Sequence, residues 1–313
     1  MYTFGMKKFV IIDGNAIIHR CYHALPKTLK APSGELTNAV YGFTSILLGI
    51  LEYEKPDYLA VAWDMKGPTF RHEEMESYKA TRAKTDDELI GQFPLTRSVL
   101  EAMEIPQFGK EGLEADDFLG MVAADVRGHH SDVAVVIVTG DQDAFQLVRD
   151  GVTVVTPVSG YKEVKRYDRE AVKAKMGVWP EQVADYKGLC GDSSDNLLGV
   201  PGIGKKTATS LLEKFGSVEG IYSRLSEVMP ERIRSLLNEH EKEARQCKRM
   251  ATILSKEDGF SVDLGKCAVH EFSMDNVREL FGRMAFRSLL GRVEVLDKEW
   301  SKRRAEEKQV SLF

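Results

Sequence analysis

Short apolar runs alternate with longer amphipathic stretches over the first half of the chain. Three runs, at residues 9–12, 58–63 and 134–138, are almost continuously hydrophobic, which is typical of parallel strands covered on both faces. Helical patterns lie between them, for example over residues 36–54 and 89–103. The order strand, helix, strand predicts an α/β domain with a mostly parallel central sheet flanked by helices.

Each of the three apolar runs leads into carboxylates. Asp13 follows the first run, Asp64 the second, and Asp141 with Asp143 the third. In an open α/β sheet the ligand site lies outside the carboxyl ends of the strands, so these acids are expected to converge. Taken singly, Asp13 or Asp64 could instead be a turn residue at a strand end.

Two further acidic clusters lie outside the strands. Glu114, Asp116 and Asp117 open a helical pattern, in which Glu114 and Asp117 share a face. For this cluster alone, compensation of the helix dipole is an open alternative. Asp192 and Asp195 lie in a loop segment farther along the chain. Nine acids that repel one another and still converge need cations, and carboxylate oxygens favour Mg²⁺ or Mn²⁺.

Composition and charge restrict the alternatives. The chain has 313 residues, 43% hydrophobic and 29% charged, which is ordinary for a globular protein with one full core and a second, smaller domain. Four cysteines without a CxxC spacing, and seven histidines without metal-binding spacing, argue against zinc and disulfides. No apolar stretch reaches the ~20 residues of a membrane span and the start lacks a signal region, so we expect a cytoplasmic protein. The net charge is −5, but setting the nine acids aside leaves +4.

Two segments carry positive charge in a pattern that suits a phosphate backbone. Residues 65–84 are highly charged and lack a continuous apolar face, so they are either a solvated excursion or a flexible arch carrying cations and an aromatic residue to nucleic acid. Residues 198–208 form a Gly-rich turn before a helix, as in a helix-hairpin-helix unit. Its Gly202 and Gly204 would let amides face outward beside Lys205 and Lys206.

These motifs together resemble a known family. IIDGN, AWD, FRHEEMESYKATRAK, GLEADD, TGDQDAFQLV, GLCGDSSDN and GVPGIGKKTA occur in the order found in bacterial 5′ nucleases of the flap endonuclease superfamily. The resemblance runs over about residues 7–296 and is strongest to the N-terminal 5′ to 3′ exonuclease domain of bacterial DNA polymerase I. It implies a PIN-like (resolvase-like) sheet, a helical arch and a helix-hairpin-helix (H3TH) subdomain.

The resemblance also implies roles for individual residues. The tighter of two metal sites would use Asp13, Asp64, Glu114, Asp116 and Asp117; Asp141 and Asp143 would lie near and between the sites, and Asp192 and Asp195 at the second. In the arch, Lys79 and Arg82 would act electrostatically and Tyr78 would lie near displaced nucleotides. Arg20 and Arg71 are further predicted DNA contacts. The chain departs from many polymerase-type members at His19 and Gln142, which puts only the handling of the 5′ end in doubt.

The implied activity is hydrolysis of DNA phosphodiesters at single-strand/duplex junctions with 5′ ends, as in removing flaps and RNA primers during replication and repair. It would use two Mg²⁺ ions, which Mn²⁺ could replace, and a K⁺ ion in the hairpin. We expect a monomer in the nucleoid-containing cytoplasm, without membrane contact. The alternatives are a noncatalytic DNA-junction binding module and a PIN-type ribonuclease, which would normally be shorter and lack the hairpin.

The predicted domains are 1–180 for the nuclease, with the arch at about 65–95, 181–290 for the helical region and 291–313 for a charged tail. The chain ends in QVSLF, which resembles the peptide by which replication proteins bind the β sliding clamp; Gln309, Leu312 and Phe313 would make that contact. A frayed terminus or the start of a linker is the alternative. The chain is either a stand-alone nuclease or part of a longer polymerase.

Overall fold

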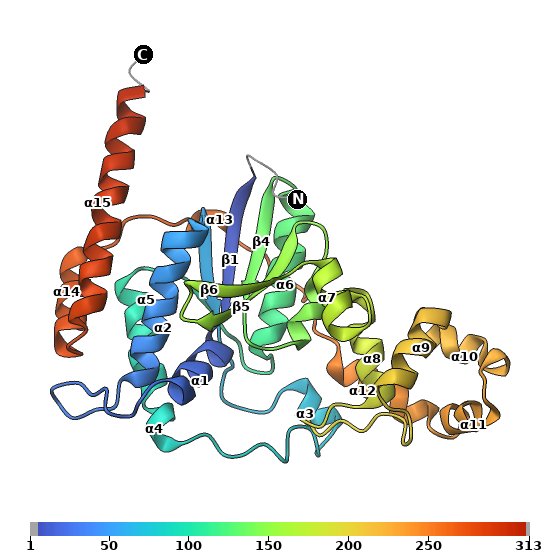
Figure 1. The fold of residues 1–313 in the computed structure, drawn as a ribbon. Coiled ribbons are helices and arrows are strands. Elements are labelled where there is room, and N and C mark those ends of the chain that lie inside the picture. The colour runs from blue at the N-terminus through green and yellow to red at the C-terminus, as the bar shows by residue number, and fades with distance from the viewer. Residues whose placement is uncertain (1–5, 311–313) are drawn as a thin grey trace.

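A six-stranded sheet with the order β3-β2-β1-β4-β5-β6 forms the centre of the molecule (Figure 1). The computed structural model describes the backbone of residues 6–310 and the side chains of residues 6–302. The first four neighbouring pairs are parallel and the β5–β6 pair is antiparallel, which confirms the predicted, mostly parallel sheet. The strands are β1 (Lys7–Asp13), β2 (Tyr58–Ala62), β3 (Gln107–Phe108), β4 (Val133–Val138), β5 (Val152–Ser159) and β6 (Glu163–Tyr167).

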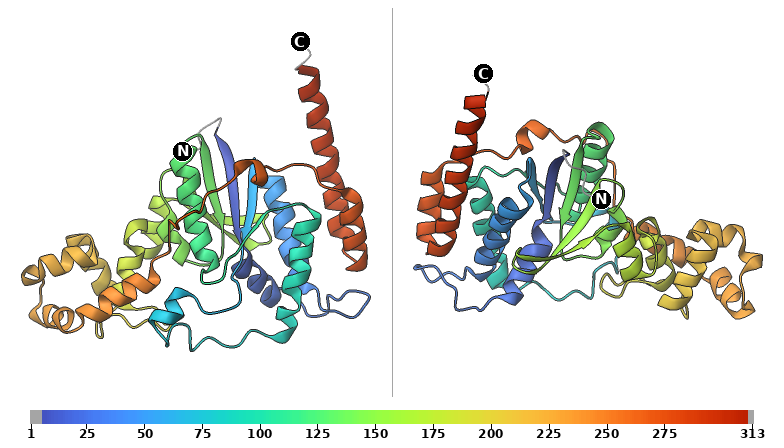
Figure 2. Two further views of the ribbon diagram at one scale, coloured as in Figure 1. Left: turned by 180° about the vertical axis from the view of Figure 1, so that it is seen from behind. Right: turned by 45° about the horizontal axis from the view of Figure 1, so that its top comes forward.

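Helices cover both faces of the sheet, as the unbroken apolar runs predicted. Along β1, Phe9 and Ile11 enter one hydrophobic core with helix α6, while Val10 and Ile12 enter a second core on the opposite face. Figures 1 and 2 show α2 and α6 on opposite sides of the sheet. The helices of this half are α1 (Gly14–Ala24), α2 (Asn38–Gly49), its π-helical extension (Ile50–Glu54), α5 (Gln92–Ala102), α6 (Ala115–His129), α14 (Met274–Arg283) and α15 (Arg287–Val310).

The strand order places a crevice at the carboxyl ends of β1 and β4. From β1 the chain passes through α1 and α2 to β2 on one side, and it later returns through α6 to β4 on the other side. Such a reversal leaves room between the connections on either side, at the point where α/β sheets bind ligands. The acids that follow β1, β2 and β4 lie at this edge.

A group of helices extends the molecule beyond β5 and β6 (Figure 1). Its members share a core with the sheet: Leu212 and Phe215 belong to the same buried cluster as Ile11 and Ile137. The predicted boundary at residue 180 coincides with the start of a short 3₁₀ helix. The elements here are α7 (Arg169–Met176), η3 (Pro180–Gln182), α8 (Val183–Cys190), α9 (Lys205–Phe215), α10 (Val218–Ser223), η4 (Leu225–Glu227), α11 (Glu231–Glu239), α12 (Glu241–Ala251) and α13 (Leu264–Cys267).

The predicted arch contains less helix than the resemblance implies. Two short helices, α3 (Phe70–Glu74) and α4 (Asp87–Ile90), flank residues 75–86, which form turns and extended chain. This stretch lacks a continuous apolar face, so an isolated helix there would bury little against the body of the protein. The segment passes below the carboxyl edge of the sheet (Figure 1).

Helix α15 runs through the predicted tail boundary at residue 291 and projects from the body (Figures 1 and 2). Its side of the core includes Leu289, Val293 and Leu296, and the Trp300 ring packs edge-on against Phe272 at 5.5 Å. Leu312, Phe313 and the side chain of Gln309 lie outside the described residues. Among the described helices, none has the length and apolar character needed to cross a membrane.

Candidate metal centre and nucleic-acid interface

A chain of hydrogen bonds fixes the acids at the ends of β1 and β4. Asp13 accepts the N–H of Ala16 at 2.9 Å through Oδ1, and the hydroxyl of Thr139 at 2.7 Å through Oδ2. The hydroxyl oxygen of Thr139 accepts the N–H of Asp141 at 3.0 Å. Asp141 Oδ1 in turn accepts the N–H of Asp143 at 2.9 Å. Three predicted metal-binding acids are therefore held in fixed positions by one network that spans two strands.

Asp64 is positioned by the starts of two helices. Its Oδ1 accepts the N–H of Ala115 at 2.7 Å, in the first turn of α6. Its own N–H donates to Oδ1 of Asn15 at 3.1 Å, in the first turn of α1. Asp64 is exposed. Its second oxygen is therefore available to a ligand at the sheet edge.

Asp116 carries the clearest sign of a missing positive charge. Its Oδ1 is buried and has no hydrogen-bond partner within the described residues. Burial, together with the charges of Asp13, Asp141 and Asp143, raises the pKa of Asp116 well above its ordinary value. Burial likewise raises the pKa of Asp13 to about 7. A buried acceptor among like charges is costly unless a cation or proton completes it, and a divalent cation with oxygen ligands fits this arrangement.

A second group of acids lies beside the first. Asp143, Asp192 and Asp195 each have a carboxylate oxygen within 4.8 Å of the other two. Burial and the neighbouring charge of Asp141 raise the pKa of Asp143 to about 7. The sequence predicted Asp192 and Asp195 at a second site, and the structure brings them to Asp143. Three oxygens at this spacing are suited to one divalent ion.

Lys187 is a member of the site that sequence reasoning missed. Its ammonium group contacts both Asp143 and Asp192 and is largely buried. Burial alone would lower the pKa of Lys187, but these two carboxylates raise it. Its position in α8, five residues before Asp192, is a signal that could have identified it. Lys187 supplies part of the positive charge that the acids require.

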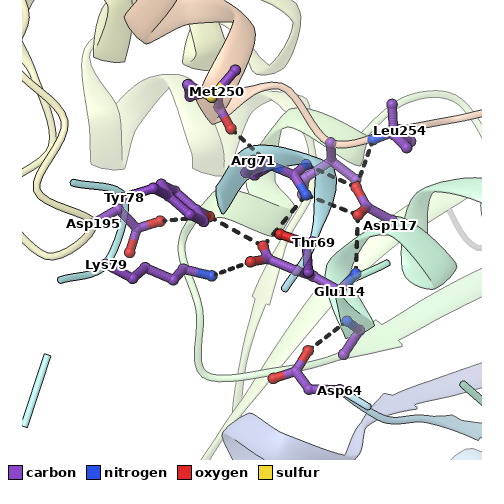
Figure 3. A network of polar contacts seen from close by, with 12 residues as sticks. Asp64, Thr69, Arg71, Tyr78, Lys79, Glu114, Asp117, Asp195, Met250 and Leu254 are labelled. Carbon is purple, nitrogen blue, oxygen red and sulfur yellow. Dashed lines mark hydrogen bonds and ion pairs between the residues drawn. The ribbon is translucent and has the colours of Figure 1, made fainter. Parts of the chain in front are cut away.

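The arch segment lies against the acids and contributes two more cations (Figure 3). Lys79 Nζ is 2.8 Å from Glu114 Oε1, and Arg82 Nη2 is 2.6 Å from Asp195 Oδ1. The hydroxyl of Tyr78 donates to Glu114 Oε2 at 3.1 Å and lies 3.4 Å from Asp195 Oδ2. Tyr78 is buried, so its ring faces the protein rather than a surface for displaced nucleotides. The three predicted arch residues thus converge on Glu114 and Asp195.

Asp117 and Arg71 point away from the acidic crevice. The carboxylate of Asp117 is fully buried and accepts the guanidinium of Arg71 and the N–H groups of Glu114 and Leu254 (Figure 3). Arg71 is itself 2% exposed. The sequence predicted a metal ligand and a DNA contact, but here both side chains are occupied with each other. Their position indicates that they support the start of α6 and the base of the arch.

The other predicted DNA contacts lie at the surface. Arg20 is exposed and donates through Nη2 to the carbonyl of Val158 at 2.9 Å. Gly202 has a φ of +84°, a left-handed conformation that favours glycine. Gly204 precedes the first turn of α9, which begins with the exposed residues Lys205 and Lys206. The hairpin therefore presents a helix N-terminus and two lysines on one exposed turn.

The donor set of the crevice has a uniform chemistry. Its members are carboxylates, with no imidazole or thiolate among the described groups, so it suits Mg²⁺ or Mn²⁺ better than zinc. The orphaned oxygen of Asp116 and the close approach of Asp143, Asp192 and Asp195 both fit bound divalent ions. The four cysteines are free thiols. The residues placed to hold ions are Asp13, Asp64, Asp116, Asp141, Asp143, Asp192 and Asp195, with Glu114 beside them.

Two family descriptions match consecutive parts of the chain. Residues 8–177 match the 5′-3′ exonuclease N-terminal resolvase-like domain, and residues 178–275 match the 5′-3′ exonuclease C-terminal SAM fold. Similar proteins include DNA polymerase I of Bacillus caldotenax, 41% identical over 288 residues, and that of Bacillus subtilis, 40% identical over 287 residues. Each alignment covers 92% of this chain and 32% of the relative. The chain thus spans about a third of the length of these relatives.

Solved structures share the fold at low sequence identity. T5 5′-exonuclease with bound divalent metal ions (zinc) superposes with a TM-score of 0.64 at 21% identity, covering 93% of this chain and 100% of that one. Flap endonuclease-1 from Methanococcus jannaschii gives a TM-score of 0.60 at 16% identity, covering 96% and 94%. These structures confirm the predicted sheet-and-helix architecture.

Proposed function

Because the chain belongs to the 5′-3′ exonuclease family, we propose that it is a structure-specific 5′ nuclease that hydrolyses DNA phosphodiester bonds at 5′ ends and at the bases of 5′ flaps. One observation carries the proposal. Acids from separate segments of the chain meet at the carboxyl edge of the sheet, where Asp116 presents a buried oxygen without a partner. A site built this way binds cations and, through them, phosphate.

Two Mg²⁺ ions, replaceable by Mn²⁺, would activate a water molecule and stabilise the leaving oxygen when bound. Their ligands are proposed to be the carboxylates of the crevice. The inner set is Asp13, Asp64, Asp116 and Asp141 around one ion and Asp143, Asp192 and Asp195 around the other. Asp117, paired with Arg71, would hold Glu114 and α6 in place behind them. No protein nucleophile is required.

The arch residues would recognise the phosphate that is cut. Lys79 and Arg82 contact Glu114 and Asp195 in the structure, so their charges already lie at the rim of the crevice. A phosphate held there would be within reach of the same cations, which would offset negative charge that develops during the reaction. Tyr78 would fix their positions through its hydroxyl contacts. Lys187 would keep Asp143 and Asp192 in place from below.

Specificity is proposed to depend on DNA shape rather than sequence. The amides and lysines of the hairpin would contact the backbone of the duplex, which carries no base information. Arg20 and the arch would contact the strand that bears the 5′ end. A K⁺ ion bound by hairpin carbonyls is part of this proposal. The biological role that follows is the removal of flaps and RNA primers in replication and repair, by a monomer in the nucleoid-containing cytoplasm.

A clamp contact and a larger assembly complete the proposal. QVSLF at residues 309–313 would bind a β sliding clamp, and α15 would carry this peptide away from the nuclease body. The similar DNA polymerase I proteins suggest a link to polymerisation, either in a longer chain or between separate proteins. Loss of clamp affinity on deleting residues 309–313 is the expected result; unchanged affinity would refute the contact.

The test of specificity compares four substrates of equal length under the same Mg²⁺ concentration: a 5′ flap, a nick, a blunt DNA duplex and an all-RNA flap. We expect cleavage at the junction of the DNA flap and at the nick, with little cutting of the blunt duplex. Preferential cutting of the all-RNA flap would indicate a ribonuclease. Tight junction binding without cutting in Mg²⁺ or Mn²⁺ would indicate a noncatalytic binding module.

A further inference from the structure

Two left-handed residues face each other where the arch meets the acidic loop. Lys79 has a φ of +55° and Asn196 a φ of +56°. Residues other than glycine seldom adopt this conformation, and when they do at a functional site the surrounding contacts usually enforce it. Asn196 directly follows Asp195, and Lys79 directly follows Tyr78. Both unusual conformations are therefore adjacent to groups that the proposed mechanism uses.

Two hydrogen bonds join these residues. The backbone N–H of Lys79 donates to the carbonyl of Asp195 at 2.9 Å. The side-chain amide of Asn196 donates through Nδ2 to the carbonyl of Ser77 at 2.8 Å. Residues 77–79 are thus fastened at two points to residues 195–196. Nearby, Arg82 Nε lies 3.5 Å from the Ser194 carbonyl, at the limit of a hydrogen bond.

This clamp sets the distance between the arch cations and the second group of acids. The side chain of Lys79 extends from the clamp to Glu114, and the carboxylate of Asp195 extends from it into the group formed with Asp143 and Asp192. A shift of residues 77–79 relative to residue 195 would therefore move Lys79 away from the crevice. Misplacement by about 1 Å is enough to lower rates by about a hundredfold in well-oriented sites.

We propose that Asn196 is a positioning residue that holds the arch cations in register with the acidic loop. Asparagine suits the position because it tolerates a left-handed backbone and also supplies a side-chain donor. Glycine meets the first requirement alone, and aspartate lacks the donor. The role of Asn196 in catalysis rests on the proposed nuclease function; the clamp itself does not.

Two variants separate the donor from the backbone conformation. Asn196→Gly keeps the left-handed conformation and removes the donor, while Asn196→Asp keeps the side-chain shape and replaces the donor with an acceptor. The matched control is Glu104→Gly, since Glu104 is also left-handed, with a φ of +53°, but lies between α5 and β3. If backbone strain alone mattered, Asn196→Gly would be neutral or favourable.

The first readout needs neither metal nor DNA. In EDTA, we expect both Asn196 variants to speed hydrogen exchange over residues 75–86 by about tenfold, the amount that loss of one net hydrogen bond allows, with exchange in α9 unchanged. Glu104→Gly should leave residues 75–86 as in the wild type. Equal exchange in the wild type and both Asn196 variants would overturn the clamp.

The second readout is the split between kcat and KM on a DNA flap. Both Asn196 variants should lower kcat about tenfold and change KM less than about twofold, because duplex contacts at the hairpin are untouched. An unchanged kcat in variants that do exchange faster would overturn the positioning role. If wild-type protein cleaved no flap while exchange still rose in the variants, the clamp would stand and the proposed nuclease function would fail.

Discussion

The guanidinium of Arg71 and the carboxylate of Asp117 form a two-point ion pair inside the protein, with Nη1–Oδ2 and Nη2–Oδ1 distances of 2.8 Å each. Arg71 also donates to the carbonyls of Met250 and Thr252, both at 2.9 Å. One side chain thus connects the base of the arch, the start of α6 and the end of α12. This arrangement predicts that Arg71 affects stability more than DNA affinity.

Replacing Arg71 with methionine is expected to lower the free energy of unfolding by about 3–5 kcal/mol, because Asp117 would be left buried without its counter-ion. Urea unfolding monitored by circular dichroism measures the change. Arg20→Met, at an exposed arginine, serves as the control and should shift stability by less than about 0.5 kcal/mol. An Arg71→Met protein as stable as the wild type would contradict the structural role.

Metal-free protein should lose stability as pH rises from about 4 to above 7. The pKa of Asp13 is raised to about 7 in the folded state, mainly by burial, from an ordinary value of 3.8. The folded protein therefore binds more protons than the unfolded chain in this range, so ionisation opposes folding as pH increases. Thermal unfolding in EDTA at pH 5.5 and pH 8 tests this. Asp13→Asn should reduce the difference in Tm between the two pH values; an unchanged difference would refute the assignment.

Lys79 is expected to act on the rate of cleavage. Lys79→Gln removes the charge next to Glu114 and should lower the single-turnover rate on a 5′ flap about 10²–10³-fold, by the scale of other electrostatic contributions. Flap affinity measured in Ca²⁺ should change much less. Lys84→Gln is the control in the same segment, since its side chain is 86% exposed and pairs only loosely with Asp87. Equal rates for the two variants would argue against an electrostatic role for Lys79.

Lys205 and Lys206 are expected to contribute to duplex affinity through phosphate contacts. Replacing both with alanine should reduce the slope of log K against log salt concentration by about 2, because each contact releases roughly one counter-ion. Affinity should fall similarly for duplexes of different sequence. Lys298→Ala, at an exposed site on α15, should leave the slope unchanged. Sequence-dependent losses would instead indicate base contacts by the hairpin.

The sheet and the acids at its edge could be predicted because both follow from local patterns. The apolar run at residues 9–12 is buried on alternate faces, and Asp13 lies where a parallel strand ends. The spacing of Glu114 and Asp117 correctly placed them in the first turn of a helix.

The partners of these acids could not be predicted in the same way. Helical spacing gives the face of Asp117 but says nothing of Arg71, 46 residues earlier in the chain. Lys187 was missed because its value depends on Asp143, which is brought close only by the packing of α8. The left-handed conformation of Asn196 is likewise enforced by tertiary contacts, since the sequence around it favours no single turn type.

The most direct measurement is single-turnover cleavage of an end-labelled 5′-flap DNA by the wild type in Mg²⁺, by the wild type in EDTA, and by Asp141→Ala in Mg²⁺. The account predicts cutting near the junction in the first reaction and its loss in the other two. Asp141→Ala should still bind the flap in Ca²⁺, which separates failed chemistry from failed binding. Cleavage that persists in EDTA or in Asp141→Ala would contradict the acidic crevice as the nuclease site.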